Sequence, residues 1–374
     1  MPALTKAQKK LAQAAGDSFS RTYAVQFGEE RWQQSLYPVL TAPTHYAALA
    51  NRFAVANLDN VFSQEQAAKI QTITFPGRPD LSDPAALKVY QWDASKTGAT
   101  FPPPQRDLSS GLMTHWNLDA ASLLAVSVLD PRPGDKILDL CAAPGGKSVA
   151  LSQFLRPDRY DSASATLEGG CLHSNELDAG RNKRLAHNLQ SYLPEALFKT
   201  GEVKVLRLDG TEPFLVQTLP LGPGGYDKVL LDAPCSSERH VIQAHVKVMR
   251  GGRMADEMAS WRSGQSKKMA KIQVALLMTA LKAVRVGGRV LYATCSLSND
   301  ENDSVIDKGI ELAQKERKKG SIGWGFAVRS GDLAARGLGD WADPTKHGWL
   351  VLPDHPSGGK WGPLFFALLE KVEA

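Results

Sequence analysis

The sequence of 374 residues predicts an α/β fold built on a doubly wound, mostly parallel sheet. From residue 119 onward, short apolar strands alternate with helical segments, which is the pattern of βαβ units. One strand-to-helix turn is rich in glycine, and acidic residues follow the neighbouring strands. Hydrophobic residues make up 43% and charged residues 22%, a balance typical of a folded chain. No apolar run approaches the ~20 residues of a membrane span, so we expect no membrane partner.

A smaller, mainly helical N-terminal region is expected over residues 1–100, ahead of the main domain at 101–374. Apolar residues within the first 20 positions are spaced for one helical face, and the basic residues there are Lys6, Lys9 and Lys10. This pattern suits either a mitochondrial targeting peptide or a surface helix. Residues 21–70 are also expected to be helical. The proline and glycine residues between 74 and 105 predict a linker.

The main domain begins with a helix over residues 119–129, which Pro131, Pro133 and Gly134 end. Apolar runs predict strands at 136–140, 171–175, 203–208, 228–231 and 289–293. Helices are expected at 148–155, 181–192 and 269–284, with Gly287 and Gly288 stopping the last one. Residues 156–170, rich in Ser, Ala and Gly, are expected to form a surface loop.

The glycine-rich turn reads Cys-Ala-Ala-Pro-Gly-Gly-Lys at residues 141–147 and stands between a strand and a helix. Gly145 and Gly146 have no Cβ, so the backbone there can approach a ligand closely. The motif is neither a phosphate-binding loop nor a dinucleotide fingerprint, which disfavours nucleotide hydrolysis and nicotinamide chemistry. A glycine turn alone also fits a plain tight turn.

Acidic residues follow three further strands. They are Glu176 after the second strand, Asp209 after the third and Asp232 after the fourth. Each of them alone is more often a helix cap or a turn residue. Because parallel strands end at the same sheet edge, the three carboxylates and the glycine turn together favour a ligand that contains adenosine.

Two cysteines follow adjacent strand ends: Cys235 in Asp-Ala-Pro-Cys and Cys295 in Thr-Cys-Ser. A thiolate is a strong nucleophile, and nearby Lys and Arg lower the pKa of a thiol. Cys141 and Cys171 are expected to be small buried hydrophobes. Four cysteines without CxxC spacing predict neither a disulfide framework nor a zinc site.

Three motifs together resemble the Nop/Sun family of RNA cytosine-5 methyltransferases. They are Asp-Leu-Cys-Ala-Ala-Pro-Gly-Gly-Lys at 139–147, Asp-Ala-Pro-Cys-Ser at 232–236 and Thr-Cys-Ser at 294–296. The resemblance covers residues 101–374. It implies a Rossmann-like methyltransferase sheet of seven strands and S-adenosyl-L-methionine as the cofactor.

The resemblance also implies roles for the motif residues. The loop of Cys141, Ala142, Ala143, Pro144, Gly145, Gly146 and Lys147 would hold the methionine part of the cofactor. Glu176 would bind the ribose hydroxyls and Asp209 the adenine end. Cys295 would be the nucleophile, and Cys235 would assist product release. Asp232 would contact the target cytosine or nearby cofactor atoms, and Lys147 would orient the site.

A departure from the family's motif limits the choice of RNA substrate. Most members of the family continue Pro-Cys-Ser-Gly. Here residues 234–240 read Pro-Cys-Ser-Ser-Glu-Arg-His, which resembles the organellar subgroup acting on mitochondrial small-subunit rRNA or a mitochondrial tRNA anticodon. Residues 22–28 and 46–49 are similar to the rRNA member. We therefore expect a mitochondrial enzyme acting on rRNA, with tRNA as the alternative substrate and the cytoplasm or nucleolus as alternative locations. No RNA-binding appendage is evident, so guidance would come from a partner protein or from the N-terminal region.

The segment 238–271 holds eight basic and three acidic residues, a difference equal to the whole net charge of +5. It is either a solvated helix face or, given the resemblance, an RNA-binding wall beside the active site. Other functions also stay open. A ribosome-assembly factor would need RNA binding without methylation, and a small-molecule or DNA methyltransferase would use the same fold. DNA cytosine enzymes attack through the Pro-Cys thiol, which would make Cys235 the nucleophile.

Overall fold

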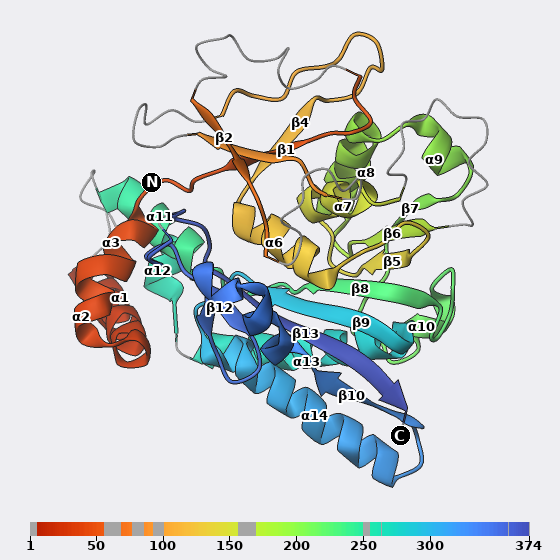
Figure 1. The fold of residues 1–374 in the computed structure, drawn as a ribbon. Coiled ribbons are helices and arrows are strands. Elements are labelled where there is room, and N and C mark those ends of the chain that lie inside the picture. Colours follow the sequence, from red (N-terminus) through yellow and green to blue (C-terminus); the bar gives the residue numbers. More distant parts are fainter. Residues whose placement is uncertain are drawn as a thin grey trace.

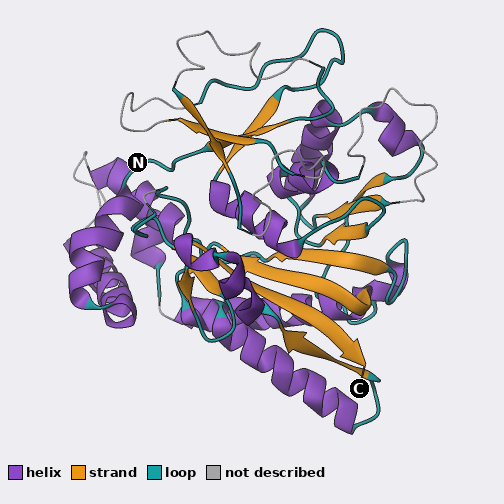
Figure 2. Cartoon of the chain, viewed as in Figure 1, coloured by secondary structure: helices purple, strands orange, loops and turns teal. Residues whose placement is uncertain are grey.

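The computed structural model describes residues 6–55, 69–76, 86–92, 101–155, 170–249, 255–262, 264–357 and 359–373. A large mixed sheet has helices on both faces, and a small antiparallel sheet lies beyond one of these helical layers (Figures 1 and 2). Within the described ranges, no helix has the length and apolar character that a bilayer crossing requires.

The large sheet has a parallel centre and an antiparallel side. The parallel strands stand in the order β7 (Val203–Leu206), β6 (Cys171–Asn175), β5 (Lys136–Asp139), β8 (Tyr226–Asp232) and β9 (Val284–Thr294). The antiparallel strands are β13 (Leu364–Glu373), which pairs with β9, and β10 (Trp324–Val328), β11 (Asp343–Pro344) and β12 (Trp349–Val351). The predicted doubly wound, mostly parallel sheet is confirmed. It has nine strands and not seven, because the short β11 and β12 extend it along the start of β13.

The strand order reverses beside β5. The chain passes from β5 outward to β6 and β7 and then returns to the other side of β5 to form β8 and β9. In such sheets the crevice for a ligand lies outside the carboxyl ends of the strands at this reversal. The loops after β5 and β8 therefore flank the expected binding crevice.

Helices cover both faces of this sheet. α6 (Ala120–Leu129), α7 (Gly146–Ser152) and α8 (Ala179–Tyr192) cover one face, and α13 (Gly264–Ala283) and α14 (Asp303–Lys318) cover the other (Figure 1). Asp119 caps α6 by accepting a hydrogen bond from the amide of Ala121, as its place before an apolar run predicts. The shorter helices are α9 (Glu195–Lys199), α10 (Leu215–Thr218), α11 (Glu238–Met249), α12 (Asp256–Ser260) and the 3-10 turns η3 (Asn299–Glu301), η4 (Ser330–Arg336) and η5 (Leu338–Asp340).

Gly287 and Gly288 do not stop a helix. α13 ends at Ala283, and β9 begins at Val284 and runs through both glycines. The pairing of β8 with β9 shifts register between Tyr226 and Lys228, opposite this stretch, and Gly287 has φ 74°. The two glycines thus lie where the pairing of the strand is irregular, and the positive φ of Gly287 there favours glycine.

The N-terminal region is less helical than predicted. Helices α1 (Lys6–Phe27), α2 (Glu29–Arg31), η1 (Trp32–Leu36) and α3 (Tyr37–Thr41) are followed by a four-stranded antiparallel sheet. Its strands are β1 (Ala47–Ala50), β2 (Ile70–Ile73), β3 (Val89–Trp92) and β4 (His115–Leu118), in the order β2-β3-β1-β4. The helix expected over 21–70 is therefore wrong over residues 42–55 and 69–70, because pairing and burial override the helix propensity of the alanine-rich β1.

Two predicted irregular segments are described only in part. β3 lies inside the expected linker, of which residues 77–85 and 93–100 fall outside the described ranges. The predicted surface loop at 156–170 also lies outside them, apart from Gly170. β4 stands beyond the predicted division near residue 100 and pairs with β1 before it.

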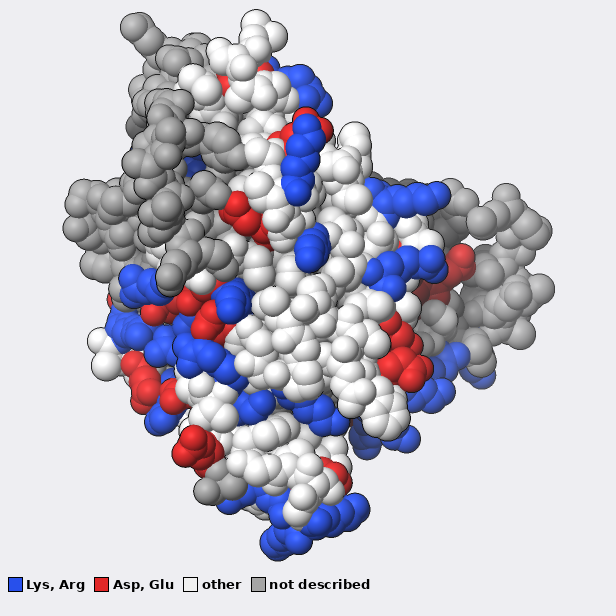
Figure 3. Space-filling view, turned by 90° about the vertical axis from the view of Figure 1, so that its right-hand side faces the viewer, with Lys and Arg blue, Asp and Glu red and all other residues white. Residues whose placement is uncertain are grey.

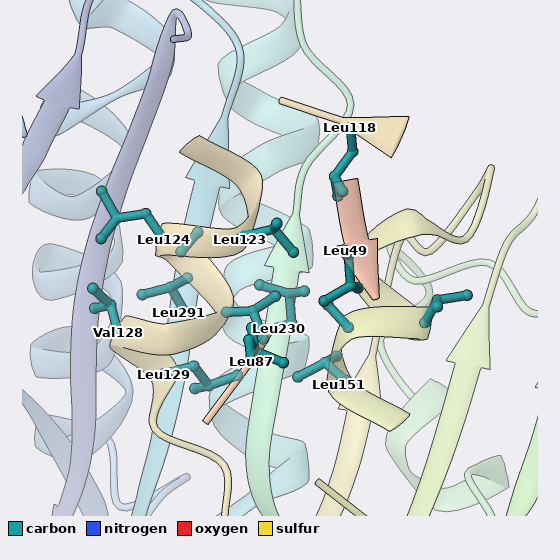
Figure 4. Close-up of a cluster of buried hydrophobic side chains, with 14 of the residues drawn as sticks. Leu49, Leu87, Leu118, Leu123, Leu124, Val128, Leu129, Leu151, Leu230 and Leu291 are labelled. Carbon is teal, nitrogen blue, oxygen red and sulfur yellow. The ribbon is translucent and has the colours of Figure 1, made fainter. Parts of the chain in front are cut away.

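The two regions share their hydrophobic cores. Helix α6 separates the two sheets, and its Leu123 and Leu124 lie among Leu230 and Leu291 of the large sheet (Figure 4). Leu49 and Leu118 of the small sheet and Leu87, just before β3, belong to the same buried cluster. A second cluster joins side chains of α1 and η1 to the opposite layer, including Phe19, Tyr23, Trp32, Tyr226 and Tyr292. The N-terminal residues therefore pack against the large sheet as part of its core.

Candidate active site

The loop of residues 141–147 links β5 to α7 at the strand-order reversal. Gly145 has φ 117° and precedes α7, and a Cβ at this position would lie 3.2 Å from Leu185 Cδ1. The carbonyl groups of Ala143 and Pro144 accept hydrogen bonds from the side chains of Arg181 and Asn188 on α8, at 2.9 and 2.7 Å. The loop is thus held in an open conformation by its backbone geometry and by helix α8.

The predicted carboxylates stand on the β6 and β7 side of this loop. Glu176 is buried, accepts the amide of Asp178 at 2.9 Å, and has Arg181 at 3.4 Å. Asp209 accepts the amide and hydroxyl of Thr211 through Oδ1. Carboxylates at these strand ends beside a glycine loop are the groups that hold ribose and adenine in doubly wound folds. The residues present therefore fit S-adenosyl-L-methionine.

Asn175 was not predicted as a site residue, although it determines how these loops meet. Its side-chain amide nitrogen donates to the carbonyl groups of Leu140 and Leu208, both at 3.0 Å. Its backbone carbonyl group accepts a hydrogen bond from the amide of Ala142. The loops after β5, β6 and β7 are joined through this one residue. The sequence holds no sign of the role, because Asn175 reads as the last residue of an apolar strand.

Lys147 and Asp232 form an ion pair across the crevice, with Nζ 2.7 Å from Oδ2. Lys147 stands in the first turn of α7 and Asp232 ends β8, 85 residues later. Burial lowers the pKa of Lys147, but the charges of Asp232 and Cys295 and the hydrogen bond to Asp232 raise it above its usual value. Lys147 and Cys295 thus lie close enough for their charges to interact, whereas the charge of Asp232 raises the pKa of Cys295.

Cys235 and Cys295 lie together, with their Sγ atoms 2.9 Å apart and Ser237 Oγ 3.3 Å from Cys295 Sγ. The hydrogen bond with Cys235 lowers the pKa of Cys295, against the opposing effect of burial. The same hydrogen bond and burial raise the pKa of Cys235. The arrangement therefore favours a thiolate on Cys295 and a thiol on Cys235.

Asp139 ends β5 and is fully buried. Burial raises its pKa to about 7, with the charge of Asp232 adding to the effect, although Ser148 donates a hydrogen bond at 2.6 Å. It supports the start of α7 from below.

The other two cysteines, Cys141 and Cys171, differ from this pair in their pKa values, because burial raises both. Cys171 begins β6, at the opposite edge of the sheet, whereas Cys141 belongs to the glycine loop. Among the residues that the structure describes, no group of His, Cys, Asp and Glu could hold a metal ion.

The basic segment 238–271 covers α11, α12 and the start of α13. Lys247, Arg262, Lys267, Lys268 and Lys271 are exposed, and Arg250 and Arg253 lie outside the described residues. For Arg239 the prediction of a solvated or RNA-binding side chain is wrong. It is buried, and its guanidinium donates to the carbonyl groups of Gly362 and Pro43. It ties α11 to the loop before β13.

The face opposite the crevice has mixed charge. β13 ends beside the C-terminus and runs antiparallel to β9, so the amino ends of the parallel strands lie on the right of Figure 1. Figure 3 views that side and shows acidic and basic side chains around a central uncharged strip. No continuous positive surface is visible on that face.

Comparison with known proteins agrees with this geometry. Residues 126–322 match the family described as 16S rRNA methyltransferase RsmB/F. The mitochondrial tRNA (cytosine(34)-C(5))-methyltransferase of Mus musculus is 33% identical over 98% of this chain and 92% of its own length. The 5-cytosine rRNA methyltransferase NSUN4 of Bos taurus is 32% identical over 80% of this chain and 74% of its own length.

Solved structures show the same fold. A methyltransferase homologue from Pyrococcus horikoshii has a TM-score of 0.57 and 19% identity, and covers 98% of this chain and 99% of its own. NSun6 from the same organism, solved with SFG, has a TM-score of 0.61 and 16% identity over 95% of this chain and 98% of its own. With a family match over more than half of its length and relatives above 30% identity, this chain belongs to the RsmB/F family of RNA cytosine-5 methyltransferases, which use S-adenosyl-L-methionine.

Proposed function

We propose that this enzyme methylates C5 of a cytosine through a covalent bond between Cys295 and C6 of the base. The observation that carries the proposal is the asymmetric cysteine pair. Cys295 lies beside Cys235, Ser237 and the Lys147–Asp232 ion pair, and its pKa is lowered while that of Cys235 is raised. A nucleophile needs the thiolate form, and the partner thiol is then free to exchange a proton.

The first step uses Cys295 alone. Its thiolate electron pair forms the bond to C6. The electrons of the C5=C6 double bond shift onto C5 and the conjugated N3–C4 part of the ring, so that C5 becomes nucleophilic. Asp232, which forms the ion pair with Lys147, would accept a hydrogen bond from the N4 amino group at the N3 and N4 edge of the cytosine. The ammonium group of Lys147 beside it would stabilise the negative charge that the ring gains.

S-adenosyl-L-methionine, when bound, supplies the methyl group as an electrophile bonded to a positive sulfur. Residues 141–147 would hold its methionine part, Glu176 its ribose and Asp209 its adenine. Once Cys295 is bonded to C6, its negative charge no longer raises the pKa of Cys235, and Cys235 can lose its proton to solvent. After C5 has received the methyl group, the Cys235 thiolate takes the C5 proton. The electron pair of that C–H bond restores C5=C6, the bond between Cys295 and C6 breaks, and Cys295 leaves as a thiolate.

The RNA that we propose is mitochondrial small-subunit rRNA. Residues 22–28 resemble the rRNA member of the subgroup, and in this chain Tyr23 and Gln26 of that segment contact the cysteine loops. The target base must leave its stack to reach a buried thiol, which favours a loop or a single strand. The exposed basic residues of 238–271 would bind the phosphates, and a partner protein would supply any further selection.

A mitochondrial tRNA is the second candidate, and one observation favours it. The relative that matches 98% of this chain, including its N-terminal region, is named for cytosine 34 of tRNA. Both candidates lead to the same compartment, so we propose a mitochondrial location. Phe19 and Tyr23 are buried in the core, so a cleaved targeting peptide would have to end before them.

Methyl transfer from labelled S-adenosyl-L-methionine into separated mitochondrial rRNA and tRNA tests the proposal. Label in the small-subunit rRNA that disappears in Cys295→Ala supports both the chemistry and the substrate. Label in tRNA alone would keep the chemistry and overturn the substrate. An enzyme that binds RNA and labels neither fraction, with or without mitochondrial protein extract, would refute the proposal in favour of an assembly factor.

A further inference from the structure

Two fully buried carboxyl groups, Glu238 and Glu301, lie directly behind the cysteine loops, and the methyl transfer described above uses neither. Glu238 begins α11, three residues after Cys235. Glu301 ends the 3-10 turn that follows Cys295. Burying a carboxyl group is costly unless hydrogen bonds compensate, so the partners of these two groups indicate what they do.

Their partners are the residues next to the cysteines. Ser236 Oγ contacts Oε1 of Glu238 and lies 2.5 Å from Oε1 of Glu301, and the amide of Ser236 donates to Glu301 at 3.1 Å. Ser296 Oγ lies 3.0 Å from Ser236 Oγ and within 3.3 Å of both carboxyl groups. The loop of Cys235 and the loop of Cys295 are therefore joined through one hydrogen-bonded cluster.

The hydroxyl group of Ser236 can donate only one proton, yet it lies against an oxygen of each carboxyl group. Both contacts are hydrogen bonds only if one carboxyl group carries a proton and donates it. Glu238 suits this role, because burial raises its pKa and the charge of Glu301 adds to the effect. Glu301 also accepts from the side-chain amide of Gln273 at 2.9 Å, and Glu238 accepts from the backbone amide of Leu297 at 2.8 Å.

Helix α1 completes the cluster from the N-terminal end of the chain. The hydroxyl of Tyr23 donates to Oε1 of Glu238 at 2.8 Å, and the side chain of Gln26 donates to the carbonyl group of Leu297 at 2.6 Å. The Tyr23 ring packs between Phe19, Trp32 and Trp261. These contacts fix α1 against the loops that carry both cysteines.

We propose that Glu238 and Glu301 are positioning residues that share a proton through Ser236, and that Tyr23 locks them, so that Cys235 is held within reach of the base bonded to Cys295. The inference rests on the proposed function, because it assigns the cluster to the order of two cysteine steps. Loosening the cluster should impair release, which needs both thiols in register, more than attack, which needs only Cys295.

The test compares two tyrosines that each lose one buried hydroxyl. Tyr23→Phe removes the contact with Glu238 and keeps the ring, whereas Tyr226→Phe removes the contact with His173 Nδ1 at the far edge of the sheet, at 2.7 Å. Turnover, RNA adduct trapped at steady state and thermal midpoint are measured for both. We expect Tyr23→Phe to lower turnover about tenfold or more and to raise adduct per turnover, with the thermal midpoints of the two variants similar. Equal effects of the two variants on turnover would overturn the proposal.

A second pair of variants tests the shared proton. Glu238→Gln has the size of the native side chain and an N–H donor in place of the carboxyl proton, so we expect turnover within about threefold of the native enzyme. Glu238→Ala should lose turnover as Tyr23→Phe does, or more. A Gln variant that folds and is as inactive as the Ala variant would refute proton sharing. If the native enzyme itself methylated no RNA, the proposed function would fail first, and that result is separate from any difference between variants.

Discussion

Cys295 Sγ lies 2.9 Å from Cys235 Sγ, although the two residues are 60 positions apart and follow different strands. β8 and β9 are adjacent and parallel, with Asp232 paired with Ala293, so the loops that follow them leave the sheet side by side. The pairing of these strands thus places the two thiols side by side at the carboxyl ends of the strands.

The first prediction separates those roles. Cys295→Ala should abolish both turnover and the covalent RNA adduct, because it removes the thiolate that we propose bonds to C6. Cys235→Ala should accumulate the adduct, because the C5 proton is no longer removed. Gel analysis under denaturing conditions measures the adduct, and Cys171→Ala, at the start of β6, is the control. Adduct that persists in Cys295→Ala and is lost in Cys235→Ala would reverse the assignment.

The second prediction concerns pH. In the proposed mechanism the thiolate of Cys295 attacks C6, so adduct formation should fall as pH decreases through the lowered pKa of this group. Lys147→Met removes the neighbouring positive charge and should shift that fall toward higher pH. RNA containing 5-fluorocytosine traps the adduct and gives the rate at each pH. Lys136→Met, exposed at the start of β5, should leave the profile unchanged, and a shift in this control would show a general charge effect.

The third prediction tests the glycine loop. Gly145→Ala places a side chain at φ 117°, at a cost of ~1–3 kcal/mol, and brings a Cβ against Leu185. We expect weaker binding of S-adenosyl-L-methionine, measured by calorimetry. Gly320→Ala, at φ 69° with no atom near its Cβ, pays the backbone cost at the end of α14 and should bind the cofactor normally. Equal affinities for the two variants would remove this loop from the cofactor site.

The fourth prediction concerns RNA. Lys267 and Lys268 are exposed near the start of α13, ahead of Gln273, whose side chain donates to the carbonyl group of Pro234 next to Cys235. Replacing both with Ala should weaken RNA binding and make its salt dependence shallower by up to about two charges. Titration at several salt concentrations measures the slope. The control replaces Lys315 and Lys318, which are exposed on α14, and a matching loss there would indicate nonspecific attraction.

The fifth prediction is a pH effect on stability. Burial, with a smaller effect of Lys204, lowers the pKa of His173 to about 4 from a usual 6.5. Between these values the unfolded chain binds the proton and the folded chain does not, so the free energy of unfolding falls as pH decreases. The contribution lost is ~3 kcal/mol at most. His173→Gln should flatten this fall in urea titrations at pH 4.5 and 6.5, and an unchanged slope would show that other groups cause it.

The repeating part of the fold could be predicted from the sequence because its signals are local. The strand beginning at Lys136, the cap at Asp119 and the glycine turn are all read within a few residues. β1 could not be predicted, since an alanine-rich segment is a strand only when β3 and β4 pair with it. The motif positions of Lys147, Asp232, Cys235 and Cys295 indicated where three strand ends meet, and the structure brings these four residues together.

Partners that lie far apart in the sequence could not be predicted. Glu238 reads as a surface charge at a helix start and is fully buried, and Arg239 reads as one of eight basic residues and is buried as well. Burial of a charge depends on donors that arrive from elsewhere, such as Tyr23 and Ser296, and no periodicity in the sequence records them. For the same reason Asn175, which joins three loops, was missed.

Helix α1 has a consequence for the order in which the molecule is made. Tyr23 meets Glu238 across 215 positions, and Gln26 meets Leu297 across 271. A ribosome delivers the chain amino end first, so Tyr23 lacks Glu238 until nearly two thirds of the 374 residues have been synthesised, and Gln26 lacks Leu297 until about four fifths have been. The helix that we propose locks the cysteine loops can therefore complete its contacts only late in synthesis.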